Sequence, residues 1–157
     1  MSRCKLLAGS LGALMIMCAA TAPAVESPAA VPFMAEGTAT LTPNMDGTLQ
    51  VSGAGEATHL GRYSVSGTQI FQPGVPPTFV GEVTMTAANG DELYIIVTGT
   101  LTSVFPNPAG EGQYEIVGGT GRFQGAFGSG SFDANTERAR YEGSITFAAG
   151  SRGRSGR

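Results

Sequence analysis

The chain has 157 residues, of which 24 are glycine, and its formal net charge at pH 7 is −3. Between Val25 and Gly150 there are twelve acidic residues, only four arginines and no lysine. We therefore expect this surface to repel nucleic acid and anionic membranes. Both cysteines, Cys4 and Cys18, come before this region, which consequently has no thiol for a disulfide, a thiolate metal site or a cysteine nucleophile.

The first 24 residues have the layout of a secretory signal peptide. Arg3 and Lys5 precede an apolar run over 6–20, and Ala22-Pro23-Ala24 supplies a small-x-small cleavage site. The apolar run is too short to span a bilayer as a permanent helix. The sequence therefore predicts a secreted or periplasmic protein that has no membrane contact after cleavage.

The rest of the chain divides into three parts by composition. An Ala/Pro/Val stretch over 25–33 is typical of an extended linker. Residues 34–149 have the length of one domain, and the Gly/Ser/Arg segment 150–157 is predicted to be a disordered basic tail.

Residues 34–149 have the pattern of β-strands, and no part of them predicts a convincing helix. In the clearest run, Ala139, Tyr141, Gly143 and Ile145 alternate with polar residues, as a half-buried strand requires. Asn89-Gly90 separates two such runs and is typical of a tight hairpin. The expected strands lie near 34–42, 47–54, 57–64, 65–72, 78–88, 91–104, 113–118 and 124–134, with 138–149 as a ninth.

Many antiparallel strands joined by short turns must protect their edges from pairing with other chains. The sequence thus predicts an all-β domain, an antiparallel up-and-down barrel of about eight strands, with a β-sandwich as the alternative. Ser and Thr dominate the expected outward faces, which argues against an outer-membrane barrel with an apolar lipid-facing band.

The glycine-rich stretch that begins at Gly118 looks at first like a phosphate-binding loop. After Gly119 and Gly121 the third glycine of a dinucleotide fingerprint is replaced by Gln124, and the residues that follow favour a strand over a helix. The sequence therefore predicts no nucleotide and no other cofactor. We interpret Gly118, Gly119 and Gly121 as a structural turn, because glycine adopts positive φ without steric cost.

The segment "VGGTGRFQGAFGSG" resembles one found in the dirigent proteins and the allene oxide cyclases, which reads G-G-[ST]-G-x-F followed by a Gly-rich strand. The resemblance covers about 15 residues, 117–131. It implies an eight-stranded antiparallel barrel and, for the activity, a cyclase or isomerase. No catalytic residue of either family has a matching motif in this chain.

Candidates for acid–base or metal chemistry are few. His59 is the only histidine and the only side chain that we consider as a general base, although a hydrogen-bonded structural role fits it better. Without cysteine, His59 cannot anchor an ordinary zinc site, and the sequence predicts no metal.

Three functions are compatible with a small secreted barrel. The first is binding of a small apolar or aromatic molecule in the lumen, with Tyr63, Phe79, Phe127 and Phe132 as lining residues. The second is a cyclase or isomerase that confines a reactive intermediate in a dry cavity. The third is a non-catalytic envelope or structural protein whose barrel is filled by its own side chains. A homo-oligomer is compatible with each of them.

Overall fold

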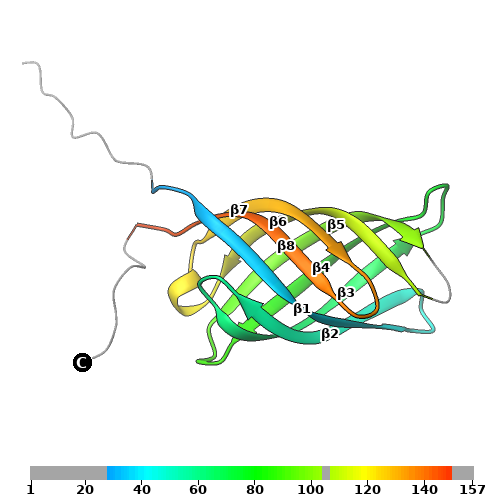
Figure 1. The fold of residues 1–157 in the computed structure, drawn as a ribbon, viewed down its shortest axis with the longest axis horizontal. Coiled ribbons are helices and arrows are strands. Elements are labelled where there is room, and N and C mark those ends of the chain that lie inside the picture. The colour runs from blue at the N-terminus through cyan, green and yellow to red at the C-terminus, as the bar shows by residue number, and fades with distance from the viewer. Residues whose placement is uncertain (1–27, 104–106, 150–157) are drawn as a thin grey trace, which may run out of the picture.

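The computed structural model describes residues 28–103 and 107–149, which form one closed barrel of eight antiparallel strands (Figure 1). Each strand pairs with the next in the chain and β8 pairs with β1, so the predicted up-and-down barrel is confirmed. The elements are β1 Val31–Pro43, β2 Thr48–Ala57, β3 Gly61–Gln72, β4 Thr78–Ala87, β5 Glu92–Ser103, β6 Ala109–Gly119, the 3₁₀ helix η1 Gly121–Phe123, β7 Phe127–Ala134 and β8 Ala139–Thr146. The expected signal peptide and basic tail lie outside the described residues.

Several strand boundaries differ from the prediction, and two of the differences bear on the strand count and the core. The segments 57–64 and 65–72 were expected as separate strands, but Gly61–Gln72 is one strand that pairs continuously with both β2 and β4. The expected ninth strand is therefore β8. β1 begins at Val31, inside the expected linker, because Phe33 faces the interior and is fully buried.

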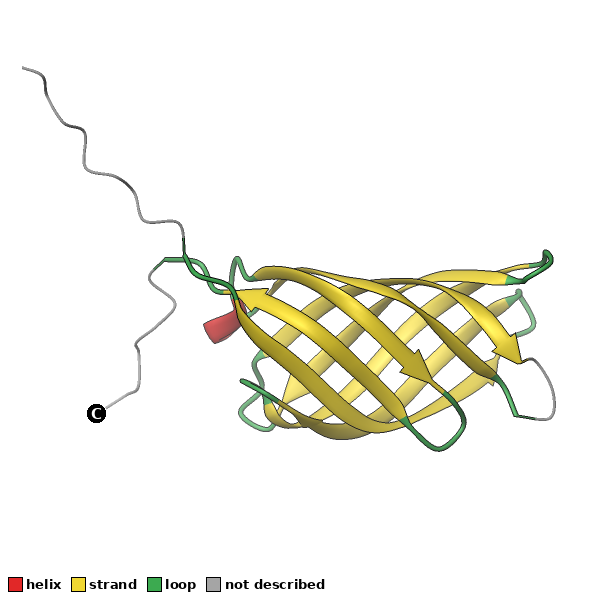
Figure 2. Ribbon diagram, turned by 45° about the horizontal axis from the view of Figure 1, so that its top comes forward, coloured by secondary structure: helices red, strands yellow, loops and turns green. Residues whose placement is uncertain are grey.

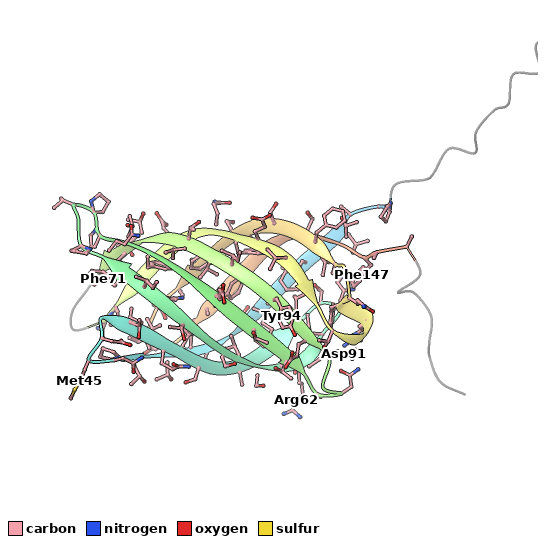
Figure 3. The ribbon with its side chains drawn as sticks, turned by 180° about the vertical axis from the view of Figure 1, so that it is seen from behind. Met45, Arg62, Phe71, Asp91, Tyr94 and Phe147 are labelled. Atoms are coloured by element: carbon pink, nitrogen blue, oxygen red, sulfur yellow. The ribbon has the colours of Figure 1, made fainter. Side chains whose placement is uncertain are left out.

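The two ends of the barrel differ. The connections 58–60, 88–91 and 120–126 lie together at the end of the barrel that carries η1 (Figure 2). We call this the plug end, and Phe123, Leu60 and Ala126 are buried there. The opposite end, which we call the mouth, carries the turns 44–47, 73–77 and 135–138. Figure 3 shows Asp91 and Phe147 at the plug end and Met45 at the mouth.

The lumen is lined by alternate residues of every strand, and its aromatic side chains lie across from residues with little or no side chain. The cross-strand pairs are Tyr63 with Gly55, Phe79 with Gly99, Phe132 with Gly112, Tyr114 with Gly130, Phe33 with Gly143, and Tyr141 with Ala35. A Cβ on Gly130 would lie 2.7 Å from Cε1 of Tyr114, and a Cβ on Gly143 would lie 2.6 Å from the Tyr114 hydroxyl. Any larger residue at these positions would overlap the Tyr114 side chain, so glycine is what makes room for it.

The rings form a continuous column through the barrel. The ring centroids are 6.0 Å apart for Phe33 and Tyr114, and 5.6 Å apart for Tyr114 and Tyr141. Phe132 stacks on Tyr141 at 5.6 Å, and Phe79 meets Phe132 edge-on at 5.9 Å. Such offset and edge-to-face contacts are the favourable geometries for aromatic pairs. The interior is consequently a packed aromatic core.

The glycine-rich turn predicted from the sequence fastens the plug end. Gly118 and Gly121 have φ values of +147° and +56°, and a Cβ on Gly121 would collide with the Asp91 carboxylate. Arg122 pairs with Asp91, at 3.5 Å between Nε and Oδ2, and donates from Nη2 to the Leu60 carbonyl at 3.3 Å. Through Arg122, the turn after β6 thus contacts the β4–β5 connection at Asp91 and the β2–β3 connection at Leu60. These contacts give the turn a structural role.

The predicted hairpin at Asn89-Gly90 is confirmed, although only Gly90 uses a positive φ, of +88°. The Gly90 amide donates to the Ala87 carbonyl at 2.9 Å and closes the turn. Among the described residues, no helix is long and apolar enough to cross a membrane.

We predict that Gly130→Ala destabilises the protein by about 1–3 kcal/mol, because the new methyl group overlaps the Tyr114 ring and the neighbouring backbone. Thermal unfolding should show a melting temperature lower by roughly 5–10 °C. Ser129→Ala is the matched control, since Ser129 is the adjacent outward-facing residue and its replacement should cost less than about 0.5 kcal/mol. Wild-type stability of Gly130→Ala would contradict the contact.

Candidate functional site

The barrel interior holds three of the four aromatic residues predicted to line it. Tyr63, Phe79 and Phe132 all point into the lumen and are buried. Tyr114, Tyr141 and Phe33, which were not among the predicted lining residues, complete the column of rings. The alternation of Tyr141 with polar neighbours was recognised, so its inward direction was available from the sequence, but its contacts depend on strand register.

Phe127 differs from the expectation. It lies on the outer face of the barrel with 55% of its surface exposed. On β7 the inward positions belong to Gly128, Gly130 and Phe132, so the odd-numbered residues before Phe132 face outward. Because two inward positions of β7 are glycines, the strand does not show the usual alternation of apolar inward residues with polar outward residues. The sequence therefore does not reveal which side of β7 faces the lumen.

A small cavity, partly open to solvent, lies at the mouth between the aromatic column and the turns. Its volume is about 50 Å³, and Phe79, Phe132 and Tyr141 form part of its wall. Leucines 41, 49 and 101 form part of its apolar rim, and Gln69 and Asn135 are the polar residues that line it. A water molecule in the liquid takes about 30 Å³, so this space has the scale of one or a few waters.

Three tyrosines lie in the interior, and burial raises the pKa of each hydroxyl. Burial raises the pKa of the Tyr63 and Tyr141 hydroxyls, and it raises the pKa of Tyr114 to about 12. The neighbouring Tyr63 and Tyr114 raise the pKa of Tyr141 further. The Tyr114 hydroxyl is buried without a hydrogen-bond partner among the described residues. High pKa values keep these hydroxyls protonated near neutral pH, so none of them is suited to act as a general base there.

His59 has structural contacts at the plug end. It sits at the β2–β3 connection with a φ of +68°, its Nε2 lies 3.0 Å from the Pro32 carbonyl oxygen, and its ring meets the Phe147 ring edge-on at 5.3 Å. The imidazole is exposed to solvent and lies outside the lumen. This placement favours the structural interpretation of His59 over the general-base interpretation.

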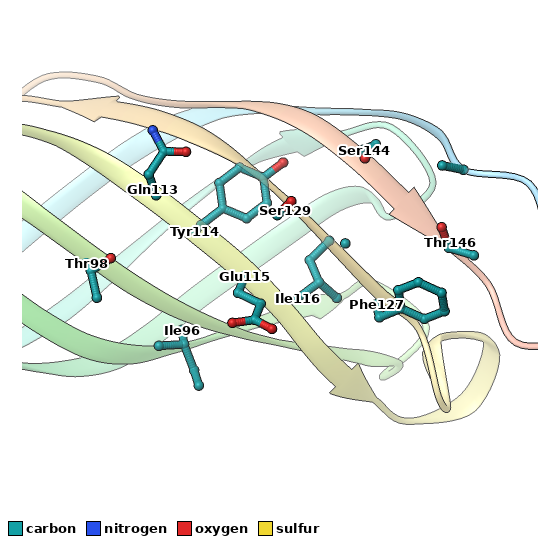
Figure 4. Close-up of a pocket in the computed structure, with 12 residues that line it drawn as sticks. Ile96, Thr98, Gln113, Tyr114, Glu115, Ile116, Phe127, Ser129, Ser144 and Thr146 are labelled. Atoms are coloured by element: carbon teal, nitrogen blue, oxygen red, sulfur yellow. The ribbon is translucent and has the colours of Figure 1, made fainter.

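A larger hollow lies on the outside of the barrel. A groove of about 710 Å³, open to solvent, crosses β5, β6, β7 and β8 (Figure 4). Its central row follows the strand register from Ile96 to Glu115, Ser129 and Ser144, one residue from each strand. Because the two serines are short, the surface is hollowed between the longer side chains around them. We call this hollow the outer groove.

The outer groove combines apolar and polar residues and has an aromatic residue at one end. Its lining residues are Ala30, Ile96, Thr98, Gln113, Tyr114, Glu115, Ile116, Phe127, Gly128, Ser129, Ser144 and Thr146. Phe127 and Thr146 pair across β7 and β8 at the end nearest η1 (Figure 4). No sequence pattern indicates this groove, since only the register between strands brings these residues together.

Residues 28–103 and 107–149 contain no group of three or more His, Asp or Glu side chains placed to hold a metal ion. Comparisons with protein-family models, with curated proteins and with solved structures found no match to this chain.

We predict that the Tyr114→Phe variant loses less stability than the wild type when the pH is raised into the alkaline range. The folded-state pKa of Tyr114, about 12, lies above its ordinary value of 10.0, so the folded protein keeps a proton that the unfolded chain releases. This contribution is complete below pH 10 and is lost as the pH rises from about 10 to about 12. Urea unfolding at pH 8 and at pH 10.5 measures the difference between the variant and the wild type.

At pH 8, Tyr114→Phe should be as stable as the wild type or more stable, because it removes a buried hydroxyl that has no partner in the described structure. A loss of more than about 1 kcal/mol at pH 8 would show instead that the hydroxyl makes a stabilising hydrogen bond.

Proposed function

We propose that this protein is a non-catalytic secreted or periplasmic barrel whose interior is filled by its own side chains and which acts through its outer surface. The supporting observation is the column of rings from Phe33 to Phe79, which leaves a described interior cavity of about 50 Å³. Pockets that hold drug-sized ligands usually measure about 300–1,000 Å³.

The chemistry of the interior supports the same proposal. Catalysis by confinement requires a chamber that holds the whole intermediate in a reactive conformation. The rings of Tyr114, Tyr141 and Phe132 occupy the space where such a chamber would lie. The resemblance of the segment around Gly121 to dirigent proteins and allene oxide cyclases rests on residues that here form a turn, and this role favours a shared architecture over a shared reaction.

A second candidate is binding of the end of an apolar molecule at the mouth. The cavity there has an apolar rim, formed by leucines 41, 49 and 101, and polar groups from Gln69 and Asn135. Combining apolar walls with a few polar groups is typical of ligand sites, although the volume suits only a short terminal group.

Thermal unfolding in the presence of indole, naphthalene or decanoate tests the proposal. We expect no stabilisation of the wild type, because no interior space takes these probes. Phe132→Ala is the positive control: it creates an apolar cavity next to Tyr141, and indole should raise its melting temperature.

The control variant will lose about 3–5 kcal/mol of stability, and Leu101→Ala at the rim replaces it if it does not fold. Stabilisation of the wild type by any of the probes would contradict a filled lumen. If Leu49→Trp abolished that stabilisation, the mouth would be the binding site, as the second candidate requires.

A further inference from the structure

The outer groove has the size of a ligand site and offers polar groups that the fold does not use. The side chains of Gln113, Glu115, Ser129 and Ser144 form no hydrogen bond or ion pair within the described part of the chain. Three of the described arginines, by contrast, form ion pairs within the fold, for example Arg138 with Glu36 at 2.9 Å. The polar side chains of the groove are therefore available to a ligand.

Thr146 provides a second, independent observation. Only 5% of its surface is exposed, and it is the one buried polar residue found among the described residues. It lines the groove beside Phe127, and its hydroxyl has no hydrogen-bond partner in residues 28–103 and 107–149. The Tyr114 hydroxyl is the one fully buried side-chain polar atom without a partner in the described residues, so the Thr146 hydroxyl keeps some contact with solvent and can bond a ligand that lies in the groove.

The composition of the groove excludes several ligand classes. Glu115 is its only charged residue and no cation lines it, so phosphate groups and acidic sugars would be repelled. An acyl chain would desolvate the amide, carboxylate and hydroxyl groups without replacing their hydrogen bonds. A peptide cannot add a strand here, because every strand of the closed barrel is paired on both sides.

A neutral sugar chain fits what remains. Pyranose rings carry hydroxyl groups around the edge and apolar C–H groups on their faces, so they need both hydrogen-bonding groups and a flat apolar surface. The exposed ring of Phe127 offers that surface at one end of the groove. Gln113 offers an amide that both donates and accepts, and Glu115 offers two acceptor oxygens.

We infer that the outer groove across β5–β8 binds a neutral oligosaccharide, with Phe127 stacking on one sugar ring and Gln113, Glu115 and Thr146 bonding its hydroxyl groups. This inference rests on the proposed function, since it assigns a ligand to the outer surface through which the protein acts.

Calorimetric titration of the purified secreted chain tests the inference. The probes are the neutral hexasaccharides of cellulose, chitin, laminarin and amylose, with polygalacturonate as the acidic comparison. We expect saturable binding of at least one neutral probe and no binding of polygalacturonate. If none of the neutral probes binds, or if the acidic polymer binds better, the inference is wrong.

Two substitutions locate the site. Phe127→Ala should weaken binding about tenfold or more, because it removes the stacking surface while leaving the barrel core intact. Tyr94→Ala is the matched control: Tyr94 is another exposed aromatic residue on the outer face, and it does not line the groove. Equal losses in both variants, or full binding by Phe127→Ala, would place the sugar elsewhere and overturn the assignment.

Two further measurements separate the possible failures. Sugar binding should be unchanged when indole is added, so displacement of the sugar by indole would point to the lumen and contradict the proposed function as well. Sedimentation at increasing protein concentration shows whether the groove instead holds a second copy of the chain. Self-association that Phe127→Ala abolishes, in a protein that binds no neutral sugar, would replace the oligosaccharide with the protein itself.

Discussion

Cross-strand pairing of aromatic rings with glycines is the constraint on which the rest of this barrel depends. A small barrel has a narrow lumen, and large rings fit only where the facing residue contributes no side chain. Gly130 and Gly143 accommodate Tyr114 in this way, and Gly99 accommodates Phe79. The high glycine content thus reflects close packing inside the barrel as well as turns between strands.

Because of the same constraint, the larger space for a ligand lies on the outside of the barrel. With rings along its length and the plug end closed by Phe123, the barrel keeps little interior space for chemistry. Its short outer residues, Ser129 and Ser144, leave a hollow that is an order of magnitude larger than the cavity at the mouth. A rigid, closed sheet holds the lining residues of that hollow in fixed positions, which reduces the entropy lost when a ligand binds.

Much of the fold could be predicted from the sequence, because alternation survives wherever the inward residues are large. The inward face of β8, with Ala139, Tyr141 and Ile145, was correctly assigned. The prediction failed where glycine takes inward positions, as around Phe127, since a missing side chain gives no hydrophobic signal. It could not find the outer groove, because the residues that line it come from four strands and meet only through the register of their hydrogen bonds.

The most direct test of the filled barrel is a crystal structure determined under xenon pressure. Xenon binds in dry apolar cavities and marks them by its strong scattering. The packing described above predicts no xenon between the rings of Phe33, Tyr114, Tyr141 and Phe132, and at most a site in the small cavity at the mouth. Xenon atoms bound along the column of rings would show an open lumen and contradict the account.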